Sequence, residues 1–150
     1  MAAYQTVVVG TDGSDSSYRA VDRAAKIAAD SGATLVIACA YHPSRPEDVV
    51  RAQDELGADV AYQVVGSTPA EESVRTATER AKRAGAAKID TVVVDGEPVP
   101  TLAKVVAERS ADLLVVGNRG LNTLAGRLLG SVPAEAARKS AVDVLIVHTT

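Results

Sequence analysis

Short apolar runs, each followed by a stretch with helical spacing, constrain the fold of this chain more than any other feature. Each run is about four to seven residues long, is rich in Val and Ile, and is mostly continuous rather than alternating with polar residues. Runs of this kind are typical of strands that are buried on both faces of a parallel sheet. We therefore predict strands at Thr6–Gly10, Thr34–Ala40, Thr91–Val94, Leu113–Gly117 and Val142–His148.

Helical patterns fill the intervals between these strands. The first pattern repeats its apolar residues at i, i+3, i+4 and i+7, and Gly32 stands where a C-terminal cap belongs. A second helix begins with a capping box at Thr68 and closes at Gly85. Two further helices are predicted at about Pro100–Ser110 and Val132–Lys139.

This alternation predicts the architecture. Strands joined by helices imply right-handed parallel crossovers, and hence an open, doubly wound α/β sheet of the Rossmann-like kind with helices on both faces. With 150 residues, the chain is long enough for a single domain, 1–150, but not for two. The one long irregular stretch, Tyr41–Ser67, has the length of a lid, a binding loop or an excursion.

Composition excludes several classes of function. The net charge is −3 and the basic residues are scattered among acidic ones, so we expect no nucleic-acid partner. The single cysteine, Cys39, excludes an internal disulfide, and with only His42 and His148 it cannot complete a structural zinc site. No apolar run approaches the ~20 residues of a membrane span, and the N-terminus lacks a basic leader. We expect a cytoplasmic protein without membrane contact.

Two strand-to-helix loops are candidate binding elements, because ligands of open α/β sheets bind beyond the carboxyl ends of the strands. The first loop, Gly10–Ser17, is rich in small and hydrogen-bonding residues, including Thr11 and Asp12. It leads into a helix N-terminus, which favours anions. A plain turn with an N-cap explains the same residues equally well.

The second loop is more specific, because four of the eleven glycines fall within residues 117–130. Gly117 and Gly120 allow a ligand to approach the backbone, and a large side chain at either is expected to abolish binding and leave the fold intact. Gly130 and Ser131 place N–H groups and a hydroxyl at a helix start, which suits a phosphate. Arg119 adds positive charge.

These glycines also carry a family resemblance. Gly117, Gly120, Gly130 and Ser131 fit the nucleotide signature of the universal stress protein family: Gly, two residues, Gly, nine residues, Gly, then Ser or Thr. The opening VVVGTDGSDSS and the closing VDVLIVH are similar to that family's first and last strands. Several segments resemble the small actinobacterial members that bind cyclic AMP as well as ATP.

The resemblance implies a strand order of 3-2-1-4-5, the fold of the adenine nucleotide alpha hydrolase-like proteins, which brings the two loops together. It also implies an adenine nucleotide ligand, with Asp12 and the Gly10–Thr11 backbone on the ribose or adenine side, Ala40 on the adenine, and Gly130 with Ser131 on the phosphate. The full set of implied binding residues is Gly10, Thr11, Asp12, Ala40, Gly117, Asn118, Arg119, Gly120, Gly130, Ser131, Val132 and Pro133.

The expected function is a sink or sensor for cyclic AMP or ATP in a stress response, with at most weak ATPase activity. ATP is expected to recruit Mg²⁺ through its phosphates, whereas cyclic AMP needs no metal. With four Tyr and no Phe or Trp, the chain must hold adenine by aliphatic and backbone contacts, with Tyr41 as the one exception.

Two other functions stay open. The first loop is loosely similar to that of the related ATP pyrophosphatases, which would make the protein an ATP-hydrolysing or AMP-transferring enzyme. The strand Val142–His148 would lie at a sheet edge with only Asp143 to discourage pairing. By resemblance it pairs across a two-fold axis in a homodimer, and a dimeric assembly module that needs no nucleotide is the other alternative.

Overall fold

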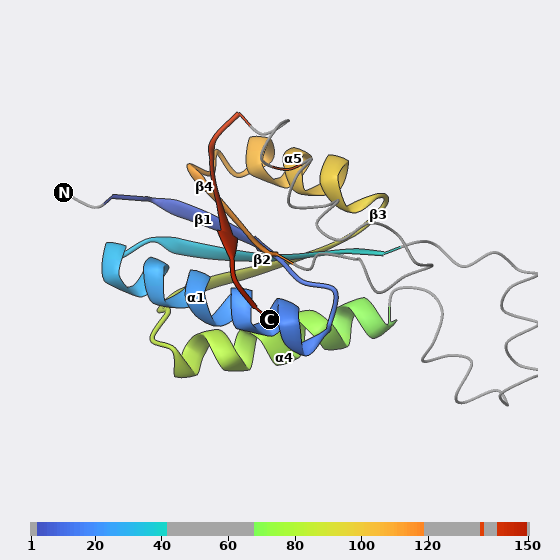
Figure 1. Cartoon of the computed structure of the whole chain (residues 1–150), viewed down its shortest axis with the longest axis horizontal. Coiled ribbons are helices and arrows are strands. Elements are labelled where there is room, and N and C mark those ends of the chain that lie inside the picture. The colour runs from blue at the N-terminus through green and yellow to red at the C-terminus, as the bar shows by residue number, and fades with distance from the viewer. Residues whose placement is uncertain (1–2, 42–67, 119–135, 137–140, 150) are drawn as a thin grey trace, which may run out of the picture.

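Figure 1 shows the computed structural model, which describes residues 3–41, 68–118, 136 and 141–149. The described elements, in chain order, are β1 (Thr6–Gly10), α1 (Asp15–Ser31), β2 (Thr34–Tyr41), α4 (Thr68–Arg83), β3 (Lys88–Asp95), α5 (Pro98–Glu108), β4 (Leu113–Gly117) and β5 (Asp143–Val147). Strands and helices alternate from β1 to β4, as the sequence pattern predicts.

All five strands are parallel and form one sheet in the order β3-β2-β1-β4-β5. β1 lies in the middle, where Val8 is in register with Val36 of β2 and with Leu114 of β4. The predicted open α/β fold and its strand order are confirmed. The order reverses between β1 and β4, and this reversal fixes where a ligand can bind.

Helices cover both faces of the sheet. In Figure 1, α1 and α4 lie on one side and α5 lies on the other. On the α1 and α4 side the core is built largely from small residues, which lets these helices pack close to the sheet. Its fully buried residues of β1, α1 and α4 are Val7, Val9, Ala20, Val21, Ala24, Ala25, Ala77 and Ala81.

The second core, on the α5 side, joins Val8, Val36 and Leu114 of the sheet to Leu102, Val105 and Val106 of α5. Ala136 is buried in the same cluster and is helical. It is the single described residue of the helix predicted at 132–139, and the other residues of that helix lie outside the described part of the chain, as do 42–67 of the long irregular stretch.

Several predicted bounds need correction. β3 extends from Lys88 rather than from Thr91, because it is an edge strand whose polar residues reach solvent while its backbone pairs with all of β2. α5 begins at Pro98 rather than Pro100, since proline is well tolerated in the first helical turn. It ends before Ser110, whose φ of 51° is left-handed. β5 is one residue shorter at each end than predicted.

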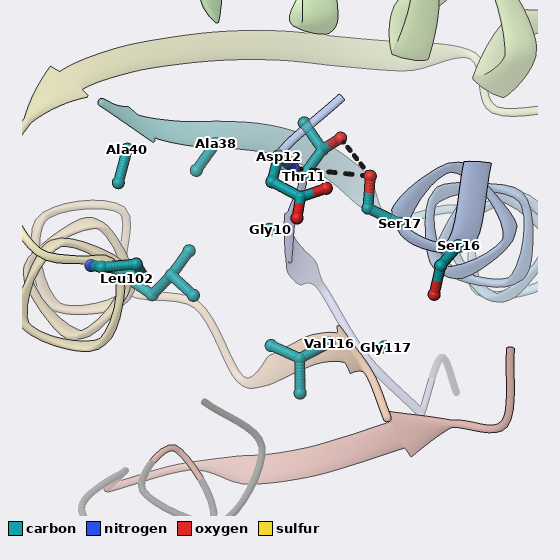
Figure 2. Close-up of a pocket in the computed structure, with 11 residues that line it drawn as sticks. Gly10, Thr11, Asp12, Ser16, Ser17, Ala38, Ala40, Leu102, Val116 and Gly117 are labelled. Carbon is teal, nitrogen blue, oxygen red and sulfur yellow. Dashed lines mark hydrogen bonds between the residues drawn. The ribbon is translucent and has the colours of Figure 1, made fainter. Parts of the chain in front are cut away.

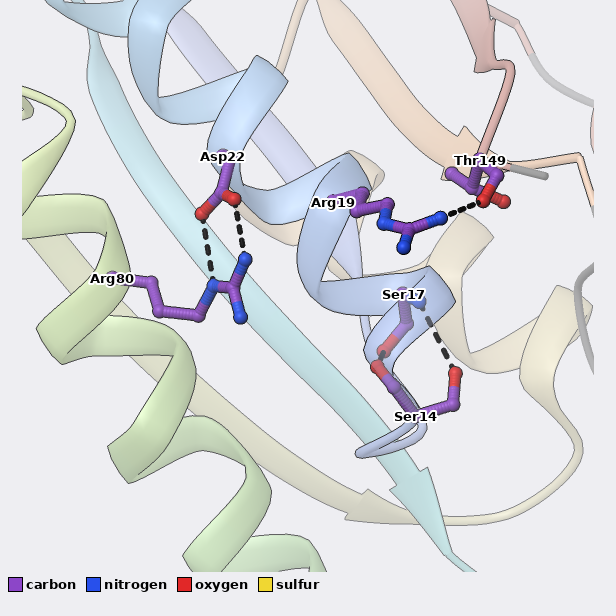
Figure 3. Close-up of polar contacts among 6 residues, drawn as sticks. All are labelled: Ser14, Ser17, Arg19, Asp22, Arg80 and Thr149. Atoms are coloured by element: carbon purple, nitrogen blue, oxygen red, sulfur yellow. Dashed lines mark hydrogen bonds and ion pairs between the residues drawn. The ribbon is translucent and has the colours of Figure 1, made fainter.

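α1 is held in place at both ends and along its side. The Ser14 side chain accepts a hydrogen bond from the Ser17 amide, and Gly32 ends the helix with a left-handed φ of 65°. Two hydrogen bonds of 3.0 and 2.6 Å join Arg80 of α4 to Asp22 of α1 (Figure 3). These contacts fix the N-terminus of α1 at the edge of the sheet where β1 ends. Among the described residues, no helix is long and apolar enough to span a membrane.

Candidate functional site

A cleft lies at the carboxyl ends of the central strands, at the point where the strand order reverses (Figure 2). It contains about 530 Å³ of empty space, part of which is open to solvent. The lining residues come from β1 and the loop after it, α1, β2, α5 and β4, and are Gly10, Thr11, Asp12, Ser16, Ser17, Ala38, Ala40, Pro98, Leu102, Val116 and Gly117.

The lining is divided into an apolar part and a polar part. Ala38 and Ala40 project from β2 and face Leu102 of α5, while Ser16 and Ser17 lie across the cleft at the start of α1 (Figure 2). The apolar part suits a flat heteroaromatic group, and the polar part suits hydroxyl or amino groups. No aromatic ring is among the described lining residues.

Hydrogen bonds within the first loop determine what its hydroxyl groups can offer a ligand. Ser17 donates its proton to the Ser14 carbonyl at 2.9 Å, so the 2.7 Å contact between Thr11 and Ser17 must use the Thr11 proton. The Gly13 amide donates to Thr11 Oγ1 at 3.2 Å. Thr11 and Ser17 therefore have no hydroxyl proton left for a ligand.

Asp12 stands at the centre of the cleft lining and is its only described titratable group. Its Oδ1 accepts the Ser14 amide at 2.9 Å. Its charge also acts on Cys39, a buried residue of β2 on the α1 and α4 side of the sheet. Burial first, and the Asp12 charge second, raise the pKa of the Cys39 thiol to about 11. The side chains of Thr11, Asp12 and Ser17 in this wall thus offer a ligand acceptors rather than donors.

The described lining residues do not make a metal site by themselves. Asp12 is a single carboxylate, and nowhere in the described ranges do three or more His, Cys, Asp or Glu side chains gather. A divalent cation at this cleft would need most of its oxygen ligands from a bound molecule, such as a polyphosphate.

Five of the site residues expected from the sequence line this cleft: Gly10, Thr11, Asp12, Ala40 and Gly117. Asn118 is adjacent to it, but its side chain bonds to the segment after β5 rather than facing the cleft. The other predicted site residues lie outside the described part of the chain, and they are Arg119, Gly120, Gly130, Ser131, Val132 and Pro133.

One expectation about Gly117 needs correction. A Cβ atom at Gly117 would lie 3.4 Å from Thr149 Cγ2 and 3.9 Å from the Ala20 side chain, on the α1 side of the sheet. A large side chain there would press on α1 and Thr149 before it reached a ligand. Substitution of Gly117 by a large residue is therefore expected to disturb the fold, rather than to block the cleft and leave the fold intact.

Tyr41 also faces away from the cleft. Alternate side chains of a strand point to opposite faces of a sheet, so Tyr41 shares a face with Cys39 and packs against the α1 and α4 cluster. Ala38 and Ala40 point the other way and line the cleft. Tyr41 is thus not a ring that stacks over the cleft.

Sequence reasoning missed Ser16, Ser17, Ala38, Pro98, Leu102 and Val116. Ala38 has a simple signal, because it lies two residues before Ala40 on the same strand and must share its face. Pro98 and Leu102 follow the carboxyl end of β3, where the rule that directs attention to strand ends also applies. Ser16 and Ser17 belong to the loop that the sequence singles out, but lie beyond its Asp12.

The fold and the cleft define an open α/β protein with a candidate ligand site at the strand-order reversal. A model of the universal stress protein family matches residues 3–148. The chain therefore belongs to the universal stress protein family. The universal stress protein Rv1636 of Mycobacterium tuberculosis strain H37Rv is 56% identical to it over 150 residues, which is 100% of both chains.

Solved structures agree with this assignment. A crystal structure of a universal stress protein in complex with cAMP is 53% identical, covers 99% of this chain and 100% of that one, and has a TM-score of 0.76. The universal stress protein UspA from Lactobacillus plantarum has a TM-score of 0.75 at 21% identity, with 98% of this chain and 99% of that one covered. The latter supports the fold alone.

Proposed function

We propose that this protein binds an adenine nucleotide, cyclic AMP or ATP, in the cleft beside β1 and β4. It would act in the cytoplasm as a nucleotide sink or sensor in a stress response. The observation that carries the proposal is the relative crystallised with cAMP, which is 53% identical over 99% of this chain. The cleft adds a site at the position where open α/β sheets bind ligands.

The polarity of the cleft supports one orientation of the nucleotide. Asp12 carries negative charge, and the protons of Thr11 and Ser17 are used within the loop. This wall therefore suits the donor groups of a ribose or an amino group, and it repels phosphate. The aliphatic side chains of Ala40 and Leu102 would contact the adenine.

We propose that the phosphate is bound by residues of the glycine-rich loop that follows β4 in the sequence. The family resemblance assigns this role to Gly130 and Ser131, with Val132 and Pro133 continuing the contact. Arg119 and Gly120 would border the nucleotide. All six lie outside the described residues, so this part of the proposal rests on the sequence signature.

The proposal is tested first on the purified protein as isolated. Denaturation releases any bound nucleotide, which mass spectrometry identifies as cyclic AMP, ATP or another compound. Calorimetric titration of the emptied protein with cyclic AMP and with ATP then gives the two dissociation constants. A folded protein that carries no nucleotide and binds neither ligand would refute the proposal and shift weight to a nucleotide-independent role.

Mg²⁺ is expected to separate the two ligands. A triphosphate in the same cleft as Asp12 is repelled by that carboxylate unless a cation carried by its own oxygens offsets the charge, whereas cyclic AMP has a single charge. EDTA should therefore weaken ATP binding and leave cyclic AMP binding unchanged. Equal ATP affinity with and without EDTA contradicts the role of the metal.

We propose binding rather than turnover. Asp12 is the only titratable group of the described lining, so these lining residues do not supply a separate general acid and general base. The alternative of an ATP-hydrolysing or AMP-transferring enzyme is tested by incubating Mg-ATP with the protein and measuring ADP, AMP and phosphate. Multiple turnovers within minutes would favour the enzyme.

We further propose a homodimer formed through β5. This strand pairs only with β4 in the sheet, and its Ile146 is 42% exposed, the single exposed large hydrophobic side chain in the described ranges. An open edge of this kind invites pairing with a second copy. Light scattering should give the mass of a dimer, and Ile146→Lys should give a monomer. A wild-type monomer at every concentration would rule the dimer out.

A further inference from the structure

A chain of hydrogen bonds joins the cleft to the segment that follows β5. Ser16 lines the cleft, and its Oγ lies 2.5 Å from Thr149 Oγ1. Thr149 in turn makes two hydrogen bonds to Oδ1 of the Asn118 side chain. The Thr149 backbone nitrogen lies 2.9 Å from Oδ1, and the Thr149 hydroxyl oxygen lies 2.8 Å from it. Three elements that are distant in sequence thus meet at one wall of the cleft.

The donor and the acceptor of each hydrogen bond in this series can be assigned from the chemistry of the groups. The Thr149 amide can only donate, so the atom of Asn118 that faces it is the carbonyl oxygen Oδ1, which can only accept. The Thr149 hydroxyl therefore donates its one proton to Oδ1. Ser16 must then donate its own proton to Thr149 Oγ1. The Ser16 oxygen is left with lone pairs alone for a ligand.

The surroundings of Thr149 hold this arrangement firmly. Its side chain and backbone are buried, with an exposed fraction of 3%. Its carbonyl accepts a 2.6 Å hydrogen bond from Arg19 of α1 (Figure 3). The backbone amide of Asn118 donates to the Val147 carbonyl at 2.9 Å, which holds Asn118 in place at the other end of this series of hydrogen bonds. The Ser16 hydroxyl is therefore oriented before any ligand arrives.

We propose that Thr149 is a positioning residue that makes Ser16 an acceptor for the 2′-hydroxyl of a bound adenine ribonucleotide. This inference rests on the proposed function. Cyclic AMP has two donor groups, the 6-amino group of the base and the ribose 2′-hydroxyl. The base suits the apolar side near Ala40 and Leu102, across the cleft from Ser16, so the 2′-hydroxyl is the donor that meets Ser16. The site thereby selects ribonucleotides over 2′-deoxyribonucleotides.

The test compares cyclic AMP with 2′-deoxy cyclic AMP by calorimetry. The wild-type protein should bind cyclic AMP about five- to tenfold more tightly, the effect of one hydrogen bond. Thr149→Val keeps the shape of the side chain and removes the hydroxyl. It should reduce this preference to about twofold or less, because the Ser16 hydroxyl then loses the partner that orients it as an acceptor. Thr149→Ser should retain the preference.

Ser16→Ala is the second variant to test. It should lose the preference for cyclic AMP over 2′-deoxy cyclic AMP although Thr149 is intact. The double variant should show no further loss, since both changes remove one shared effect. Thermal unfolding of each variant checks that it is folded. If Thr149→Val does not fold, Ser16→Ala still decides whether Ser16 reads the 2′-hydroxyl.

Each other outcome overturns the inference in a distinguishable way. A wild-type preference below twofold means that Ser16 does not meet the 2′-hydroxyl. An unchanged preference in Thr149→Val, or an equal loss of affinity for both ligands, means that Thr149 only supports the fold. A wild-type protein that binds neither cyclic AMP nor ATP refutes the proposed function itself, and with it the inference.

Discussion

Replacing Gly10 by Ala would place a methyl group against Leu102 at the edge of the cleft. The added Cβ would lie 3.1 and 3.2 Å from the two Cδ atoms of Leu102. Carbon atoms in van der Waals contact are about 3.5–4.0 Å apart, so Leu102 must shift by about 0.3–0.9 Å. Leu102 belongs to the same buried cluster as Val105 and Val106 and also lines the cleft, so the open direction is the cleft.

The free energies follow from this geometry. Overpacking in a core that cannot yield costs about 1–3 kcal/mol. Here the end of a leucine side chain can move into empty space, and exchange of Gly for Ala recovers about 0.4–1 kcal/mol through the unfolded state. The free energy of unfolding should therefore change by less than about 1 kcal/mol. The steric cost appears instead when a ligand fills the cleft, and we expect affinity to fall about tenfold, or about 1.4 kcal/mol.

The assay combines calorimetric titration with cyclic AMP and thermal unfolding of the free protein. The matched control is the double variant Gly10→Ala/Leu102→Val, which removes one carbon atom from the residue that has to move. In the Leu102→Val background, Gly10→Ala should therefore cost much less affinity than it does in the wild-type protein. Unchanged affinity in Gly10→Ala would refute the argument that Leu102 is displaced into the ligand, and so would a loss that Leu102→Val does not relieve.

Three further predictions concern charge, protonation and the unused tyrosine. Arg80→Ala should lower the free energy of unfolding by about 0.5–1 kcal/mol, because the ion pair between Arg80 and Asp22 is partly exposed, and the loss should be smaller at high salt. The control is Lys104→Ala, whose ion pair with Glu108 is 3.9 Å long and exposed; it should change the free energy of unfolding by less than about 0.3 kcal/mol. Because the pKa of the Cys39 thiol is about 11 in the fold and 9.0 as its ordinary value, the unfolded chain loses this proton first. The free energy of unfolding should therefore fall by about 1–2 kcal/mol through this group as pH rises from 9 to 11. When it is measured by urea unfolding at each pH, Cys39→Ala should lack this part of the decrease. Tyr41→Ala should leave cyclic AMP affinity within about twofold in calorimetry, because Tyr41 packs on the α1 and α4 side of the sheet, and a tenfold loss would show that its ring reaches the ligand.

The sequence predicts the strands and most of the helices well, because burial leaves a strong local pattern. Val7, Val8 and Val9 are all fully buried, which is why their run reads as a central strand. The bounds of β3 are less predictable, because Lys88 and Asp90 are polar and belong to the strand only through pairing with β2. Such pairing is a tertiary effect that no local window contains.

The candidate site is predicted in part for the same reason. Gly10, Asp12 and Gly117 lie in loops that directly follow strands, so a rule about strand ends finds them. The part played by Thr149 has no local signal. It depends on β5 lying beside β4 and on the N-terminus of α1 lying near the carboxyl end of β5. This arrangement brings Ser16 and Thr149 together from positions far apart in the chain.

The cleft lies along the seam between β1 and β4, two strands that are neighbours in space but separated by roughly a hundred residues of chain. Contacts of such long range carry the largest loop-closure entropy, so the seam cannot be present in partly folded chains that hold only local helices and the β1–β2 pair. A ligand that requires both strands therefore recognises the completed sheet alone. It would raise the melting temperature with ligand concentration, and a fall in nucleotide supply would leave the same chain easier to unfold and degrade.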